Sequence, residues 1–187
     1  MTPPFEHHGD QTGDQTGFGG RAELPGWVSG VVAEAEAVVG RLAELCVVGL
    51  SPSELAGVLG ALEGVFRRVD VVKAELAGRI DRGGLHRADG FRTAAAMLGH
   101  VGKLSDRSAK QRVGIARAMV VLAEVAAAYR AGELSTDQMA VLARLARNPR
   151  IAGSLVEVQG YLVEAARRLD ARDFATFVSQ LQRLLDD

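Results

Sequence analysis

The amino-acid sequence predicts an all-α protein: an elongated bundle of six to seven helices, with a long antiparallel hairpin at its N-terminal end and a helix-turn-helix-like segment in its middle. Three observations support this class. Apolar residues recur at spacings of three and four along most of the chain, as on one face of a helix. Hydrophobic residues make up 48% of the chain and aromatic residues only 5%, so Ala, Val and Leu must fill the core. No segment shows the alternation that is typical of a strand.

The N-terminal residues 1–25 differ in composition from the rest of the chain. The stretch "GDQTGDQTGFGG" repeats a polar unit and contains five glycines. Such a segment cannot bury enough apolar surface to offset the entropy of ordering, so we expect a disordered polar tail. Residues 26–187 are then expected to form a single helical domain.

Two long helices are expected first, over residues 27–48 and 52–82. In the second, Ser51 and Glu54 are spaced as a capping box, and Pro52 suits the first helical position. The short link between the helices predicts that they are antiparallel neighbours. Three glycines on one face of the second helix predict close approach by another helix: Gly57, Gly60 and Gly64.

Five more helices follow after the Gly83-Gly84 stop. A short helix is expected over residues 92–101, and the Gly102-Lys103 pair breaks it. Ser105 is expected to cap the next helix, which runs to about residue 128 with a kink near Gly114. The last three helices are expected over residues 135–147, 151–169 and 171–185.

Positive charge is concentrated in the middle of a nearly neutral chain. Residues 79–117 contain nine basic and three acidic residues, net +6, whereas residues 1–78 are net −6 and the whole chain is −1. On a helical wheel of residues 105–122, Ala109, Val113, Ala116 and Val120 form a buried stripe, and three cations share an adjoining arc. A narrow row of cations beside an apolar strip suits a helix that lies against double-stranded DNA. The candidate DNA contacts are Arg87, Arg92, Lys103, Arg107, Lys110 and Arg117.

A second interpretation of these cations stays open. They could pair with the acidic residues of the first two helices and so balance charge within the molecule. Phe91 is the only aromatic residue among them, which argues against a platform that stacks single-stranded bases.

Three stretches resemble the 13E12 repeat family of actinobacterial proteins, whose N-terminal part is a domain of unknown function, DUF 222. They are "LHRADGFRTAAAML", "LSDRSAKQRVGIARAM" and "AGELSTDQMAVLARLAR", and the likeness covers about residues 50–187. The resemblance implies a helical module that usually precedes an HNH endonuclease domain in proteins linked to mobile elements. Met97 stands where the family tends to have tryptophan, and no HNH segment is present in this sequence. Any divalent metal would therefore belong to the missing nuclease domain, and no cofactor is expected in this chain.

The sequence lacks a recognisable catalytic constellation. There is no nucleophile elbow, phosphate-binding loop or pair of zinc-ligand histidines. The single cysteine, Cys46, excludes an internal disulfide and is expected to be a buried thiol. No apolar run is long enough to span a bilayer, and no secretory signal is visible, so we expect a cytoplasmic protein without a membrane partner.

Two further interpretations stay open beside DNA engagement. The apolar stripes and the glycine face of the first two helices could serve self-association, binding of a downstream nuclease domain or another protein partner. The apolar pattern also continues to Leu185, close to the last residue, as it would in a truncated gene remnant without activity.

Overall fold

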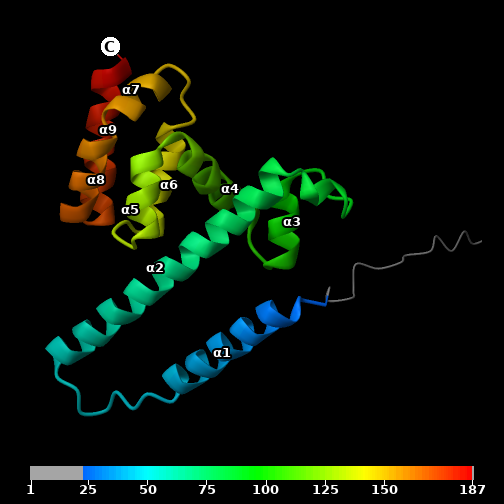
Figure 1. The fold of residues 1–187 in the computed structure, drawn as a ribbon. Helices are drawn as coiled ribbons and strands as arrows, with labels where there is room; N and C mark the ends of the chain where they lie inside the picture. The colour runs from blue at the N-terminus through cyan, green and yellow to red at the C-terminus, as the bar shows by residue number, and fades with distance from the viewer. Residues whose placement is uncertain (1–22, 187) are drawn as a thin grey trace, which may run out of the picture. The chain divides into compact units, whose positions relative to one another are not determined.

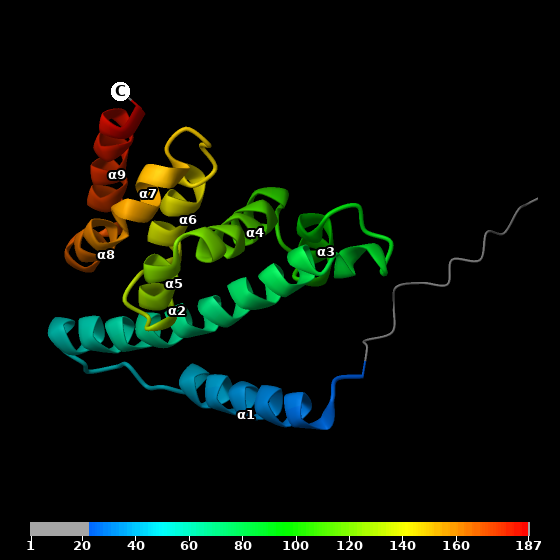
Figure 2. The same ribbon diagram turned by 45° about the horizontal axis from the view of Figure 1, so that its top comes forward.

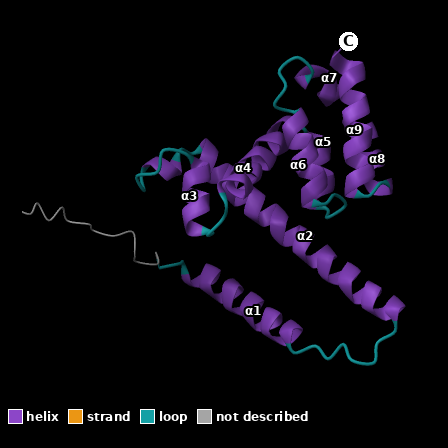
Figure 3. Cartoon of the chain, turned by 180° about the vertical axis from the view of Figure 1, so that it is seen from behind, coloured by secondary structure: helices purple, strands orange, loops and turns teal. Residues whose placement is uncertain are grey.

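The computed structural model describes residues 23–186, and every regular element within them is helical. There are nine α-helices and one short 3-10 helix in that part of the chain, all drawn in purple in Figure 3. The predicted all-α class is therefore confirmed. Nearly all of the predicted disordered tail lies outside the described residues.

The contacts divide the chain into two units, residues 1–49 and residues 50–187, and each is described by itself. The antiparallel pairing of the first two helices, the elongated form and the single domain over residues 26–187 stay predictions.

The described part of the first unit consists of helix α1 (Gly26–Ala43) and the residues around it. The helix ends five residues before the predicted end, and its last turn closes with a hydrogen bond from the Glu44 N–H to the Arg41 carbonyl at 3.2 Å. Cys46 follows in an exposed loop, so the expectation of a buried thiol is wrong. α1 contains no buried residue.

The second unit begins with α2 (Pro52–Arg82), which has the predicted capping box. The Glu54 N–H donates to the Ser51 hydroxyl at 3.3 Å, and the Ser51 N–H donates to a Glu54 carboxylate oxygen at 2.8 Å. The first buried residue of this helix is Val71, and Ala74, Ala77 and Gly78 follow. Only the C-terminal part of α2, the long diagonal helix in Figure 1, therefore packs into the core of its unit.

The glycine face of α2 does not make the expected close helix contact within residues 50–187. A Cβ atom added at Gly57 or Gly60 would meet no heavy atom within 4 Å, and one at Gly64 would meet only the Arg67 side chain, at 3.8 Å. These glycines therefore take no part in the packing of their own unit.

Residues 23–186 contain nine α-helices where six to seven were expected, because two of the expected helices are each divided in two. The fourth expected helix becomes α4 and α5, and it is interrupted at Leu122 rather than at Gly114. The sixth becomes α7 and α8, interrupted at Val158. After the 3-10 helix Leu85–Arg87, the helices are α3 (Ala94–Val101), α4 (Asp106–Val121), α5 (Ala123–Arg130), α6 (Thr136–Leu145), α7 (Ala152–Glu157), α8 (Gln159–Arg168) and α9 (Ala171–Asp186).

One buried side chain serves both interruptions. The Gln159 side-chain oxygen accepts a hydrogen bond from the Glu124 N–H at the start of α5, at 2.9 Å, and its nitrogen donates to the Val156 carbonyl of α7, at 3.0 Å. Only 4% of Gln159 is exposed. Helix ends leave backbone groups without partners inside the helix. Gln159 therefore supplies such partners at both helix breaks, although Glu124 and Gln159 lie 35 residues apart in the chain.

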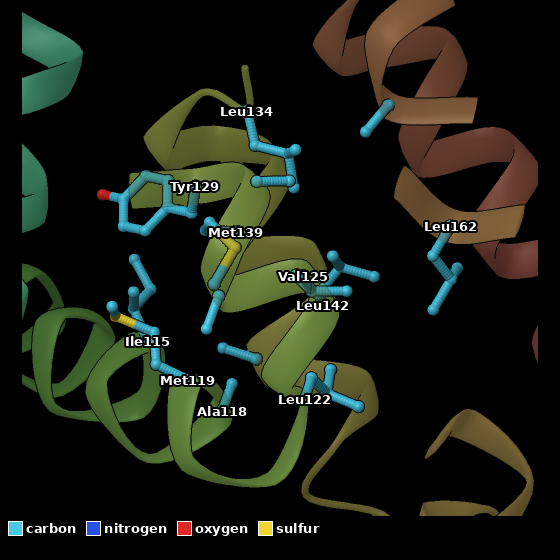
Figure 4. Close-up of a cluster of buried hydrophobic side chains, with 14 of the residues drawn as sticks. Ile115, Ala118, Met119, Leu122, Val125, Tyr129, Leu134, Met139, Leu142 and Leu162 are labelled. Carbon is cyan, nitrogen blue, oxygen red and sulfur yellow. The ribbon is translucent and has the colours of Figure 1, made fainter. Parts of the chain in front are cut away.

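The core of the second unit lies among α2, α4, α5, α6, α7, α8 and α9, as Figure 4 shows for part of it. Tyr129 of α5 is fully buried, and its hydroxyl lies 3.1 Å from the hydroxyl of Thr136. Thr136 donates in turn to the Asp70 carboxylate of α2 at 2.8 Å. The other large, fully buried side chains are apolar: Phe174, Leu122, Leu134, Met139, Leu142, Ile151, Leu155, Leu162 and Val125.

Candidate nucleic-acid interface

The predicted helix-turn-helix-like segment is present as α3, a four-residue turn and α4. Thr93 caps α3 by accepting from the Ala96 N–H at 3.1 Å, and Ser105 caps α4 by accepting from the Ser108 N–H, also at 3.1 Å. The turn between them places Lys103 at φ 49°, a left-handed conformation. Non-glycine residues seldom adopt it, because the Cβ atom is crowded there. Figure 2 shows α3 beside the end of α2 and α4 leading toward α5.

α4 is buried on more of its surface than a single stripe. It packs against α2, α3, α5 and α6. Ala109, Val113 and Ala116 are buried as predicted, but Val120 is 61% exposed, so its placement in the buried stripe was wrong. The wider contact of α4 buries three additional residues: Ile115, Ala118 and Met119.

All six predicted contact residues are exposed, but they differ in their partners. Arg117 is bound to Asp81 of α2 by two parallel hydrogen bonds, from Nε at 2.7 Å and from a terminal nitrogen at 2.8 Å. These hydrogen bonds from Arg117 hold the pKa of the Asp81 carboxyl below its ordinary value. Lys110 pairs with Asp106 one turn away, at 2.7 Å. The side chains of both Lys110 and Asp106 are more than two-thirds exposed, so that pair is weak.

Within residues 23–186, no ion pair involves the other four predicted residues. Arg107 lies in the first turn of α4, and Lys103 lies in the turn before it. Arg87 ends the 3-10 helix, which lies beside α2 and contains the buried His86. Arg92 lies in the loop just before α3. The alternative of charge balance within the molecule thus applies in this part of the chain to Arg117 and, locally, to Lys110.

Two adjoining hollows lie along the exposed arc of α4. One, of about 350 Å³, is formed between α4 and α6, and the other, of about 330 Å³, extends toward Asp81 and the start of α3. Gly114 lines both, and a Cβ atom there would lie 3.9 Å from the Cβ of Ala143 on α6. Small residues therefore let the two helices approach closely and form the floor of the hollows.

Two arginines that sequence reasoning missed also line the hollow between α4 and α6. They are Arg144, in the last turn of α6, and Arg147, just after it, and both are exposed. They lie outside the basic stretch 79–117, so a search for local charge does not find them. One local signal does exist. Arg144 follows Ala140 by four residues and Arg147 follows Ala143 by four, so each arginine lies one helical turn beyond a small apolar residue.

The side chains that this surface offers to a ligand are mainly cationic. Among the described residues, no group of three His, Cys, Asp or Glu side chains is close enough together to hold a metal ion. None of the helices in residues 23–186 combines the length and the apolarity needed to cross a bilayer. Phe91 lies against His100, with ring centroids 5.5 Å apart.

Residues 56–187 match a protein-family model described as "Domain of unknown function (DUF222)". The match covers more than half of the chain. This chain belongs to the DUF222 family. The DUF222 match includes α3, α4, α6 and both hollows, and it excludes α1. Searches of curated proteins and of solved structures found no significant match.

Proposed function

We propose that this DUF222 chain is a non-catalytic helical module that engages double-stranded DNA through the segment from Arg87 to Arg117. The observation that carries the proposal is the row of exposed cations on and before α4. Four of the six have no ion pair within the described residues, so their charge is available to a polyanion. Neutralised phosphates release counterions, which makes such contacts favourable and dependent on salt.

The resemblance to 13E12 repeat proteins supports a finer proposal, that the module assists an HNH endonuclease in the cytoplasm. In that arrangement this chain supplies affinity for the duplex, and the nuclease domain supplies the metal and the chemistry. The proposal is tested by reading the coding sequence that surrounds this segment. A neighbouring ββα-metal motif in the same reading frame supports it, and a frame without such a motif contradicts it.

DNA engagement is tested by titrating a labelled duplex at several salt concentrations with the triple variant Arg107→Ala, Lys110→Ala and Arg117→Ala. We expect the slope of log affinity against log salt to fall by about two, because Arg117 is already held by Asp81 and contributes little. The matched control removes three exposed arginines of α8 and α9: Arg168, Arg172 and Arg183. Unchanged affinity and slope in the first variant would show that the proposal is wrong.

A second candidate function is self-association through α2. Large apolar side chains remain exposed along one face of this helix, and none before Val71 is buried. They are Leu55, Leu59, Val65, Phe66, Val69, Val72 and Leu76. Their spacing of three, four and seven suits a second copy of the same helix. Sedimentation at micromolar concentration should then show a dimer that the double variant Leu59→Glu, Phe66→Glu dissociates, whereas a monomer at all concentrations would rule this function out.

A further inference from the structure

The hollow between α4 and α6, which we term the α4–α6 groove, is lined by positively charged side chains from two separate segments of the chain. It is lined by Arg107 and Lys110 of α4, by Arg144 in the last turn of α6 and by Arg147 just after α6. These two pairs are separated by more than thirty residues in the sequence, and the packing of α4 on α6 brings them to one groove.

The groove has almost no compensating negative charge. Among the described residues, Asp106 is the one acidic residue that lines it, and its carboxylate pairs with Lys110 at 2.7 Å. Within residues 23–186, neither Arg107, Arg144 nor Arg147 makes an ion pair. A cleft lined by charge of one sign concentrates ligands of the opposite sign. The missing partners are therefore expected on an anionic ligand.

The floor of the groove indicates which part of such a ligand it accepts. Gly114, Ala140 and Ala143 form it, so a chain can approach the helices closely. None of the aromatic side chains in residues 23–186 lines the groove, so this part of the chain offers no surface there on which a base could stack. Arginine guanidinium groups bind phosphate through two parallel hydrogen bonds. These features fit a phosphodiester backbone rather than bases.

The burial of α4 gives an independent reason for backbone contact. The helix packs against four other helices, and its exposed arc is continuous with α6. A recognition helix reads sequence by projecting side chains into the major groove, free of neighbouring elements on that side. Here α6 flanks the exposed arc, so the arc and α6 present one shared surface.

We propose that the α4–α6 groove holds one phosphodiester strand of double-stranded DNA without regard to its sequence, and that Arg144 and Arg147 supply half of the phosphate contacts there. This inference rests on the proposed DNA engagement. It adds two binding residues from outside the basic segment, and it assigns the contact to the backbone.

The test uses the full chain and two labelled duplexes of equal length and unrelated sequence. The double variant Arg144→Ala, Arg147→Ala should reduce the salt slope by about two and the affinity by about ten-fold, equally on both duplexes. The double variant to Lys at both positions should retain most of the slope, because the charge remains. Arg172→Ala with Arg183→Ala is the matched control. Since neither Arg144 nor Arg147 has an ion pair to lose, thermal unfolding should stay unchanged.

Each contrary result separates the two proposals. One result is that Arg144→Ala, Arg147→Ala behaves as its control while the triple variant of Arg107, Lys110 and Arg117 loses affinity. The groove assignment is then wrong and DNA engagement stands. If Arg144→Ala, Arg147→Ala weakens binding to only one of the two duplexes, the contact depends on base sequence and its assignment to the backbone is wrong. If the unaltered chain binds neither duplex, both proposals are overturned.

Discussion

The polar side chains of the C-terminal core and the cations on and before α4 differ in their burial and in whether they have partners within the molecule. Gln138 and Gln159 are about 95% buried, and both the oxygen and the nitrogen of each side-chain amide have partners. Arg107, Lys103 and their neighbours are exposed and mostly have no ion pair within the described residues. A buried polar group without a partner is costly, so the core glutamines must be saturated. The cations bear no such constraint and remain available to a ligand.

This contrast predicts that changing a core glutamine alters stability and leaves binding intact. Gln159→Leu leaves the Glu124 N–H and the Val156 carbonyl without their partner, so we expect a loss of about 2–3 kcal/mol in the free energy of unfolding. Urea unfolding measures this loss. Duplex affinity, measured below the unfolding transition, should not change. Gln180→Leu, at an exposed position of α9, is the control and should have little effect.

The turn before α4 offers a change in which stability and binding move in opposite directions. Lys103 is strained at φ 49°, and glycine adopts this conformation freely. Lys103→Gly should therefore raise the free energy of unfolding by about 0.5–1 kcal/mol. The same variant should weaken duplex binding at low salt, because one cation is lost. Lys103→Ala removes the charge without relieving the strain, so equal stability of the two variants would contradict this explanation.

Arg117 of α4 is held by Asp81 of α2, and its charge should become available to DNA when Asp81 is made neutral. Asp81→Asn removes the carboxylate that binds Arg117 and should increase both duplex affinity and the salt slope, the slope by about one. The free energy of unfolding should fall by only about 0.5 kcal/mol or less, because the Arg117 side chain is 68% exposed. An affinity that stays the same would show that Arg117 does not face the DNA.

The same ion pair predicts a small dependence of stability on pH. The pKa of Asp81 is lower in the folded protein than its ordinary value near 3.8, since Arg117 donates hydrogen bonds to the ionised form. The stabilisation is therefore complete above the unfolded pKa, and it is lost as the pH falls through the folded pKa. Unfolding curves of the unaltered chain and of Asp81→Asn should converge as the pH is lowered below 4. A constant difference between them down to pH 2 would be inconsistent with this linkage.

Local signals in the sequence were sufficient for the helical class and for most helix starts. Ser51, Ser105 and Ser135 act as caps where predicted, because a cap depends on residues three positions apart. The exposed arc with Arg107, Lys110 and Arg117 also follows from helical periodicity alone. These features require no knowledge of the rest of the molecule.

Contacts between distant segments decided what the sequence could not show. The break at Leu122 is stabilised by Gln159, and the Arg117 charge is neutralised by Asp81. Arg144 and Arg107 line one groove only because α6 packs on α4. The sequence by itself determined the helical class, most helix starts and which face of α4 is charged, since caps and periodicity within a helix are local. Only the tertiary structure decided where helices break and which cations share a groove, because those outcomes depend on partners that folding brings together from far along the chain.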